Sequence, residues 1–315
     1  MRVHVDTAGH EQPVGAIDDL FIGLAIEIDF GGRDPAIGTD SQIGAPFAVD
    51  VDHGSTGQQH ESDSRGASTV ASDMPVTVPD SLDAALAALA SNPDATVLAG
   101  GTDLMVEVND GRRPLIHVVA LGRVPELRGV RLAREGAGDE IVIGASVTHA
   151  ELTRAPVAEL APALAYAART VGSPQIQNAG TIGGNLATAS PAGDTLPVLV
   201  ALGATVDIVG PGGIRSVPIG DFFVGPKRSA LQGGELVLAV RVPVRRGPQD
   251  YLKVGVRNAM VIAVASLAIS VDLDARAVGI GLGSVGPTPL AAPDACMWIA
   301  ARIRWRDDGI HVDTA

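Results

Sequence analysis

Apolar and polar positions recur from residue 80 onward in patterns that predict helices interspersed with short strands. The first helix is expected to begin at Asp80, a candidate N-cap, with Asp83 in its first turn. Its leucines share one face: Leu82, Leu86 and Leu89. The later elements are expected to be strands at 96–99 and 115–121, paired strands at 130–134 and 140–145 joined by a turn at 136–139, helices at 147–154, 157–171 and 194–203, and strands at 204–209, 236–242, 262–273 and 277–284. This mixture of helices and strands indicates an α+β fold.

Two glycine-rich stretches carry the candidate chemistry. Residues 99–104 read Ala-Gly-Gly-Thr-Asp-Leu, and residues 180–185 read Gly-Thr-Ile-Gly-Gly-Asn. Paired glycines let the backbone take positive φ and turn successive amide N–H groups toward one point, which can hold a phosphate without a basic side chain. The hydroxyls of Thr102 and Thr181 and the amide of Asn185 add donors. Two such loops could hold one pyrophosphate from two sides, which predicts a dinucleotide site.

An ordinary turn also explains each stretch taken alone. The chain has 38 glycines among 315 residues, so Gly-Gly pairs arise by chance, and short motifs carry a high false-positive risk. The sequence contains no G-x-x-x-x-G-K-[ST] motif. A formal G-x-G-x-x-G occurs at 281–286, but Pro287 and Pro289 follow it. No helix is expected to begin there, so this match does not predict a Rossmann site.

Composition narrows the class of protein. Hydrophobic residues make up 46% of the chain and its formal net charge is −13, which disfavours binding to a phosphate backbone. No apolar run approaches the length of a membrane span, and the first residues lack the pattern of a secretory signal, so the expected compartment is the cytoplasm. The single Cys296 excludes an internal disulfide and a cysteine-ligated iron–sulfur cluster within this chain.

The glycine stretches belong to a longer series of motifs. The series comprises 79–85 (PDSLDAA), 97–108 (VLAGGTDLMVEV), 143–152 (IGASVTHAEL), 180–206 (GTIGGNLATASPAGDTLPVLVALGATV), 233–243 (GGELVLAVRVP) and 251–258 (YLKVGVRN). In this order and spacing it resembles the FAD-binding medium subunit of molybdenum hydroxylases, the xanthine dehydrogenase and carbon monoxide dehydrogenase family with a PCMH-type FAD domain. Several motifs in order are far more specific than any one of them.

The resemblance implies a domain organisation. Residues 74–245 would form the PCMH-type FAD-binding domain, with two α/β subdomains clasping FAD, and residues 249–294 a truncated C-terminal α+β domain. Residues 1–73 match nothing in the family and are expected to be poorly ordered. They are either the product of an upstream start codon, with Met74 as the family-like start, or a real arm.

Residues 295–315 form an atypical tail beyond the resemblance. In the family, later helices help to cover the sheet formed by the last two expected strands. In this tail Arg302, Arg304 and Arg306 interrupt the apolar positions. The sheet is therefore expected to keep a partly uncovered apolar face, and the isolated chain to self-associate.

The resemblance also implies one non-covalent FAD site. The residues assigned to it, none of them catalytic or metal-binding, are Val97, Leu98, Ala99, Gly100, Gly101, Thr102, Asp103, Leu104, Thr181, Gly183, Gly184, Asn185, Asp194, Val237 and Lys253. The two stretches would close on the pyrophosphate. Asp194 would lie near the ribityl chain, Val237 would contact the ring, and Lys253 would place positive charge near the flavin. Asp194 is equally well explained as the N-cap of the helix that follows, and Lys253 as a solvated surface residue.

Other residues receive simpler interpretations. His117 and His149 are most simply surface or strand-end residues. Gln177 stands where many relatives carry an arginine, which would remove a charge near the phosphates. Pro226 stands where some relatives carry a tyrosine that could cover the flavin ring.

The implied function is that of an oxidoreductase subunit that is inactive without its partners. A large molybdopterin-containing subunit would hydroxylate the substrate, and a small [2Fe–2S] subunit would relay electrons. FAD in this chain would pass them to NAD or another acceptor. Two alternatives stay open: a self-contained flavin oxidase, and a non-catalytic remnant unable to assemble.

Overall fold

The computed structural model describes residues 74–135, 138–306 and 309–312. The predictions made for residues 1–73 and for the turn tip at 136–137 lie outside the described residues. The described chain contains a three-stranded, a five-stranded and a four-stranded sheet, together with two isolated hairpins.

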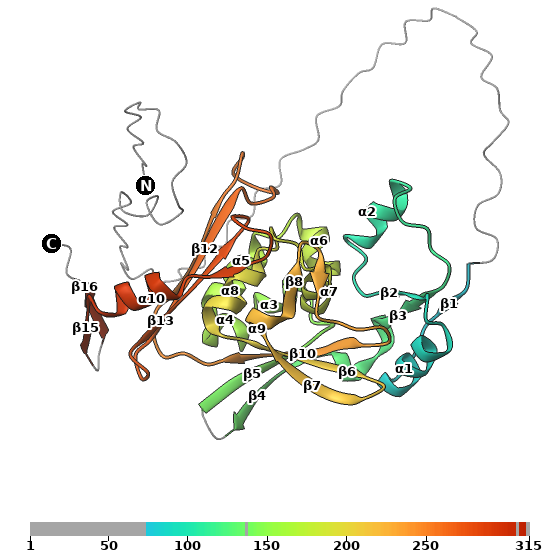
Figure 1. Ribbon diagram of the computed structural model, residues 1–315, viewed down its shortest axis with the longest axis horizontal. Coiled ribbons are helices and arrows are strands. Elements are labelled where there is room, and N and C mark those ends of the chain that lie inside the picture. Colours follow the sequence, from blue (N-terminus) through green and yellow to red (C-terminus); the bar gives the residue numbers. More distant parts are fainter. Residues whose placement is uncertain (1–73, 136–137, 307–308, 313–315) are drawn as a thin grey trace, which may run out of the picture. The chain divides into compact units, whose positions relative to one another are not determined.

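The three-stranded sheet and its helices contain the first glycine stretch. Its strands are parallel, in the order β1-β3-β2 (Figure 1). The elements of this part are β1 (Val76–Thr77), α1 (Leu82–Ser91), β2 (Thr96–Leu98), α2 (Leu104–Asn109), β3 (Val118–Ala120) and two short 3-10 helices, Leu121–Arg123 and Pro125–Leu127. The glycine stretch is therefore the connection between β2 and α2.

Helix α1 begins one residue later than the sequence predicted. Its N-cap is Ser81, whose hydroxyl accepts a hydrogen bond of 3.2 Å from the amide of Ala84. The prediction of Asp80 as the cap is therefore wrong, because the carboxylate lies one position too early to reach the free amides of the first turn. The helix buries Ala85 and Leu89.

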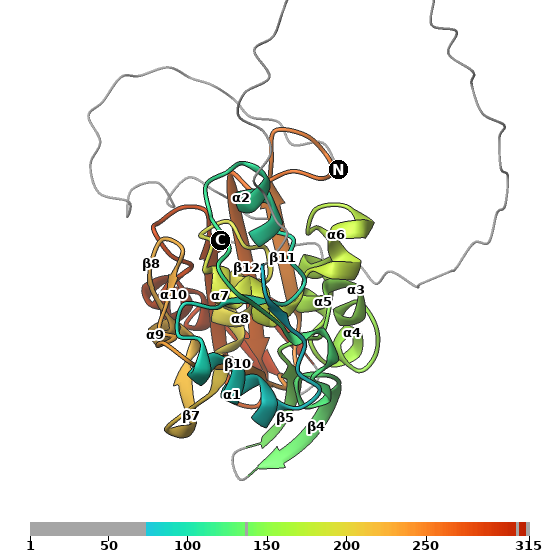
Figure 2. The same ribbon diagram turned by 90° about the vertical axis from the view of Figure 1, so that its right-hand side faces the viewer.

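The five-stranded sheet is antiparallel throughout, in the order β4-β5-β10-β6-β7. Helices α3 to α6 form one packed group beside it (Figure 2). The elements of this part are β4 (Val130–Glu135), β5 (Gly138–Gly144), α3 (His149–Leu152), α4 (Val157–Leu160), α5 (Pro162–Arg169), α6 (Pro174–Ala179), α7 (Ile182–Thr188), α8 (Thr195–Leu202), β6 (Thr205–Gly210), β7 (Gly213–Pro218), α9 (Ile219–Phe222), β8 (Phe223–Gly225), β9 (Arg228–Ser229) and β10 (Leu236–Pro243).

The single helix predicted at 157–171 is two helices. Ala161 separates α4 from α5 with φ −137° and ψ 63°, outside the helical region. Pro162 follows it and is the first residue of α5. A proline disfavours helical geometry at the residue before it and is well tolerated at the first helical position, so the break falls between these two residues.

The four-stranded sheet packs on α8, and its glycines have a structural explanation. Its antiparallel strands are β11 (Gln249–Val254), β12 (Ala265–Asp272), β13 (Ala277–Gly283) and β14 (Leu290–Ala291), with α10 (Pro293–Ala300), β15 (Ile303–Arg306) and β16 (Gly309–Val312) after them. A Cβ added at Gly279 would lie 1.8 Å from the carbonyl oxygen of Ala201, and one at Gly281 would lie 1.9 Å from that of Pro197. Alternate glycines therefore let α8 lie directly on the strand, and no helix begins at the G-x-G-x-x-G match, as predicted.

The sequence predicted a partly uncovered apolar face on this sheet, and this prediction is wrong for β13, which the tail covers. Helix α10 packs along β13 (Figure 1). Ile303 joins Val278 and Ile280 in a small buried cluster, with Ile299 and Trp305 against it. The arginines of β15 do not prevent this, because side chains alternate along the strand: Ile303 is buried, and Arg304 and Arg306 are exposed.

Apolar side chains do remain exposed beyond that cluster. They lie on β11 and in the segment that connects it to β12: Leu252, Val254, Val256, Met260, Ile262 and Val264. Across the described ranges, the helices are all too short or too polar to cross a bilayer.

Candidate functional site

Both glycine stretches line one cavity of about 700 Å³. This volume lies within the range of about 300–1,000 Å³ that is typical of small-molecule and cofactor sites. The wall includes the connection from β2 to α2, the start of α7 and the start of β10. All of the residues assigned to the site from the sequence line this cavity except Leu98 and Lys253.

The two stretches meet with almost no space between their backbones. A Cβ added at Gly100 would lie 1.9 Å from the carbonyl oxygen of Ala179. One added at Gly180 would lie 3.1 Å from Cδ2 of His149 and 3.3 Å from Oγ1 of Thr102. Gly100 therefore requires glycine for the close approach of two chain segments, and Gly180 leaves little room for a side chain, so chance turns do not explain the stretches.

The first stretch keeps a row of unused hydrogen-bond donors on the cavity wall. The amide groups of Gly100, Gly101, Thr102 and Asp103 donate no hydrogen bond within the part of the chain that the structure describes. Gly101 has φ +73°, as expected of a residue that turns successive amides in one direction. Successive unpartnered amides form a concave site for an anion. These donors fit a pyrophosphate.

The second stretch differs from the prediction. It begins helix α7, with Thr181 as N-cap, and none of its glycines has positive φ. The hydroxyl of Thr181 accepts from the amide of Gly184 at 3.0 Å, and the amide of Gly183 donates to the carbonyl of Ala145 at 2.9 Å. The predicted nest of turned amides is therefore wrong here.

Close packing explains the glycines of the second stretch instead. A Cβ added at Gly183 would lie 2.6 Å from Cβ of Ala145. Two residues of this stretch keep donors: the amide and hydroxyl of Thr181 donate to no atom of the described chain, and Asn185 offers its side-chain amide. Oδ1 of Asn185 accepts from the Thr195 hydroxyl at 2.7 Å, which leaves Nδ2 for a ligand.

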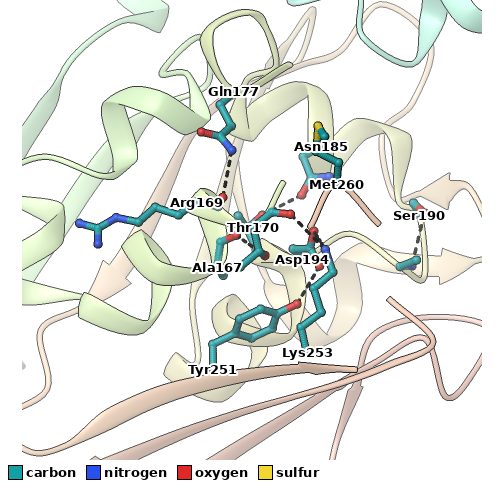
Figure 3. A network of polar contacts seen from close by, with 12 residues as sticks. Ala167, Arg169, Thr170, Gln177, Asn185, Ser190, Asp194, Tyr251, Lys253 and Met260 are labelled. Carbon is teal, nitrogen blue, oxygen red and sulfur yellow. Dashed lines mark hydrogen bonds and ion pairs between the residues drawn. The ribbon is translucent and has the colours of Figure 1, made fainter. Parts of the chain in front are cut away.

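Asp194 lies on the cavity wall and is held by two donors from β11 (Figure 3). Its Oδ1 accepts from the hydroxyl of Tyr251 and its Oδ2 from Nζ of Lys253, both at 2.8 Å. Nζ of Lys253 also donates to the carbonyl of Thr170 at 3.1 Å. Burial raises the pKa of Asp194, and the hydrogen bonds from Lys253 and Tyr251 act in the opposite direction. Burial and the neighbouring carboxylate of Asp194 raise the pKa of Tyr251.

This network corrects two interpretations. Lys253 is not a solvated surface residue, because its side chain is only 10% exposed, and it lies behind Asp194 instead of on the cavity wall. Asp194 occupies the N-cap position of α8, but its side chain makes no cap hydrogen bond. Both of its oxygens are directed to β11 instead.

His149 lines the cavity and was missed in the sequence, whereas His117 and Gln177 lie away from the wall. His149 is 3% exposed and belongs to α3, so its interpretation as a surface or strand-end residue is wrong. Its place in the motif at 143–152 was the signal that could have found it. His117 is half-buried and bonds Thr77 at 2.8 Å. Gln177 bonds the carbonyl of Arg169 at 2.9 Å and does not line the cavity.

Charged residues also line the cavity. Glu107 of α2 pairs with Lys227 of the β8–β9 hairpin at 3.1 Å and with Arg113 at 3.5 Å. Lys227 lowers the pKa of Glu107 through this contact. Glu235 pairs with Arg215 at 2.7 Å, which lowers the pKa of Glu235. The wall cations Lys227 and Arg113 already share a carboxylate, so backbone amides are the donors best placed for an anion.

Comparison with known proteins agrees with this geometry. The family described as FAD binding domain in molybdopterin dehydrogenase matches residues 70–245. The xanthine dehydrogenase FAD-binding subunit of Escherichia coli O157:H7 is 31% identical over 216 residues, which cover 66% of this chain and 72% of that protein. The carbon monoxide dehydrogenase medium chain of Hydrogenophaga pseudoflava is 36% identical over 151 residues, 48% of this chain and 51% of that one.

Solved structures give the same result. Reconstituted CO dehydrogenase from Oligotropha carboxidovorans superposes with a TM-score of 0.67 at 31% identity, over 73% of this chain and 81% of that one. The chain belongs to the family of FAD-binding medium subunits of molybdopterin dehydrogenases, with a PCMH-type FAD domain. It is an oxidoreductase FAD subunit of the xanthine and carbon monoxide dehydrogenase type. The predicted α+β fold is confirmed.

Proposed function

We propose that this chain binds one FAD non-covalently in the cavity and serves as the electron-transfer subunit of a molybdenum hydroxylase complex. The observation that carries the proposal is the meeting of the two glycine stretches on one wall, where four successive amides, from Gly100 to Asp103, donate no hydrogen bond within the described residues. A pyrophosphate is the part of FAD that such donors recognise.

In this proposal the chain holds the cofactor mainly through its backbone. The amides of 100–103 and the hydroxyl of Thr102 donate to the pyrophosphate, and Nδ2 of Asn185 donates from the opposite stretch. Gly100 lets the first segment lie directly against Ala179 and Gly180 at the start of the second. Gly183 packs the second segment against Ala145. Preorganised amides contribute to binding affinity without the loss of conformational entropy that ordering long basic side chains would cost.

Asp194 and Val237 would position the rest of the cofactor. Asp194 is an acceptor on the cavity wall, and Tyr251 and Lys253 hold it in place, so it suits the hydroxyls of the ribityl chain. Val237 is buried at the start of β10 and offers apolar contact to the ring. Lys253 would affect the cofactor only by holding Asp194 in position. Its Nζ donates to that carboxylate, and its side chain does not line the cavity.

FAD, when bound, would accept two electrons and pass them on. The electrons would come from a [2Fe–2S] centre on a small partner subunit, supplied in turn by a large molybdopterin subunit, and would leave to NAD or another acceptor. This chain cannot ligate the cluster itself, because Cys296 is its single cysteine. The names of two relatives, FAD-binding subunit and medium chain, support the proposal that this chain has partner subunits.

An absorption spectrum and a binding titration test the cofactor assignment. The purified chain, stripped and titrated with FAD, is expected to bind one flavin, which acid precipitation releases into the supernatant. A chain that binds no FAD overturns the proposal, and flavin that stays with the precipitate shows a covalent link instead. Co-purification of two further subunits that contain molybdopterin and iron–sulfur separates the complex from a self-contained oxidase.

A further inference from the structure

His149 is a buried side chain on the cavity wall whose hydrogen-bonding groups are unused. It is 3% exposed, and its imidazole makes no hydrogen bond within the described ranges. Nδ1 is buried without a partner, whereas Nε2 is not among the buried unpartnered atoms. A buried polar group without a partner is rare and costs stability, so it requires an explanation.

The backbone fixes where the ring lies. The amide of His149 donates to the carbonyl of Gly180 at 3.0 Å, which ties α3 to the start of the second glycine stretch. The Cδ2 edge of the ring then faces Gly180, because a Cβ there would lie 3.1 Å from Cδ2. The same added Cβ would lie 3.3 Å from the hydroxyl oxygen of Thr102, so the imidazole and this hydroxyl both lie close to Gly180.

Burial also settles the state of the ring. It lowers the pKa of His149 to about 4, so the imidazole is neutral at neutral pH. A neutral imidazole carries its proton on one nitrogen only. A proton on Nδ1 would be a buried N–H without an acceptor, which is rarer in proteins than an open acceptor, whereas Nε2 is not among the buried unpartnered atoms. The favoured tautomer therefore has its proton on Nε2, the nitrogen that the cavity can reach.

We propose that His149 is a further binding residue, which donates a hydrogen bond from Nε2 to a phosphate oxygen of the bound cofactor where the two glycine stretches meet. This inference rests on the proposed FAD site and adds a neutral side-chain donor to its backbone amides. In this proposal Nε2 gains an acceptor from the ligand, while Nδ1 stays a buried, unprotonated atom.

The test compares two substitutions in the full chain. His149→Leu removes the donor and keeps an apolar side chain of similar size, whereas His149→Gln keeps an N–H near the position of Nε2. FAD and ADP, which share the pyrophosphate, are titrated into each stripped protein. His149→Leu is expected to weaken both roughly three- to tenfold, the effect of one neutral hydrogen bond, and His149→Gln to restore most of the affinity.

The melting temperature of the ligand-free protein distinguishes a binding role of His149 from a structural one. Without ligand, His149→Leu is expected to melt no lower than the parent, because it removes an unpartnered buried atom. His117→Leu is the matched control, since His117 bonds Thr77 and is not on the cavity wall. It is expected to leave both affinities unchanged.

The outcomes are distinct. If the parent binds neither FAD nor ADP, the proposed function fails. If the parent binds both and His149→Leu binds them equally well, or His117→Leu weakens binding as much, only the inference on His149 fails. If the leucine variant does not fold, nitrogen NMR of the unaltered chain decides: ADP is expected to shift the Nε2–H resonance of His149 and leave Nδ1 unprotonated, and an unchanged resonance overturns the inference.

Discussion

The hydroxyl of Tyr251 donates a hydrogen bond of 2.8 Å to Oδ1 of Asp194, and the tyrosine is fully buried. The bond joins β11 of the four-stranded sheet to the residue that precedes α8 and lines the cavity. It therefore links the position of a wall carboxylate to the packing of a different sheet.

Removing that donor should destabilise the protein. Tyr251→Phe leaves Oδ1 of Asp194 buried with one donor fewer, so the free energy of unfolding is expected to fall by about 1–3 kcal/mol. Urea unfolding at neutral pH measures it. Tyr166→Phe is the control, because Tyr166 is 51% exposed and only touches the edge of the Tyr251 ring. Equal stability of the two variants would contradict the role given to this hydrogen bond.

The cavity glycines should be intolerant of a single methyl group. Gly100→Ala places a Cβ where the carbonyl oxygen of Ala179 lies 1.9 Å away, so the two stretches must separate. FAD affinity is expected to fall at least tenfold, which corresponds to about 1.4 kcal/mol. Gly220→Ala is the control, since a Cβ at this exposed position meets nothing within 4 Å. Equal flavin affinity of both variants would show that the stretches do not hold the cofactor.

Stability should depend on pH through His149. Its pKa is about 4 in the folded chain, below the value of 6.5 for a free histidine, so the unfolded chain binds the proton first. Its contribution is complete above about pH 6.5 and is lost as the pH falls toward 4, by about 3 kcal/mol at most. His149→Leu should therefore lose less stability than the parent between pH 7 and pH 4 in urea titrations. Parallel curves for the two proteins would contradict this.

The tail should prove necessary for a covered sheet. Ile303→Asp puts a charge into the cluster with Val278 and Ile280, so the chain is expected to bind a hydrophobic dye and to self-associate. Trp298→Asp is the control, because Trp298 is 59% exposed. Light scattering and dye fluorescence compare the two. If the parent already binds dye and associates, the exposed apolar residues around β11 dominate instead.

Local patterns in the sequence predicted the order of the main elements and the two glycine stretches. Continuous apolar runs identify the helix at 194–203 and the strand at 204–209, because both elements are buried on nearly every side. The polar strand β7 and the cap of α1 escaped prediction, since solvent-facing strands and neighbouring cap candidates such as Asp80 and Ser81 differ little in sequence.

Tertiary contacts determine why glycine is needed at each position of the two stretches. Gly101 turns the backbone with φ +73°, whereas Gly100 and Gly183 have no side chain because another segment occupies that space. Residues far apart in sequence create these requirements, such as Ala179 against Gly100. A glycine looks the same in the sequence in both cases.

The sequence by itself determined that two donor-rich stretches exist and that they occur in a family order. Only the tertiary structure decided which donors remain for a ligand. The amides from Gly100 to Asp103 stay unpaired in the described chain, while that of Gly183 is used by Ala145 and Lys253 is held by Asp194. Whether a polar group is available depends on the partners that folding brings to it, and those partners lie outside any local pattern.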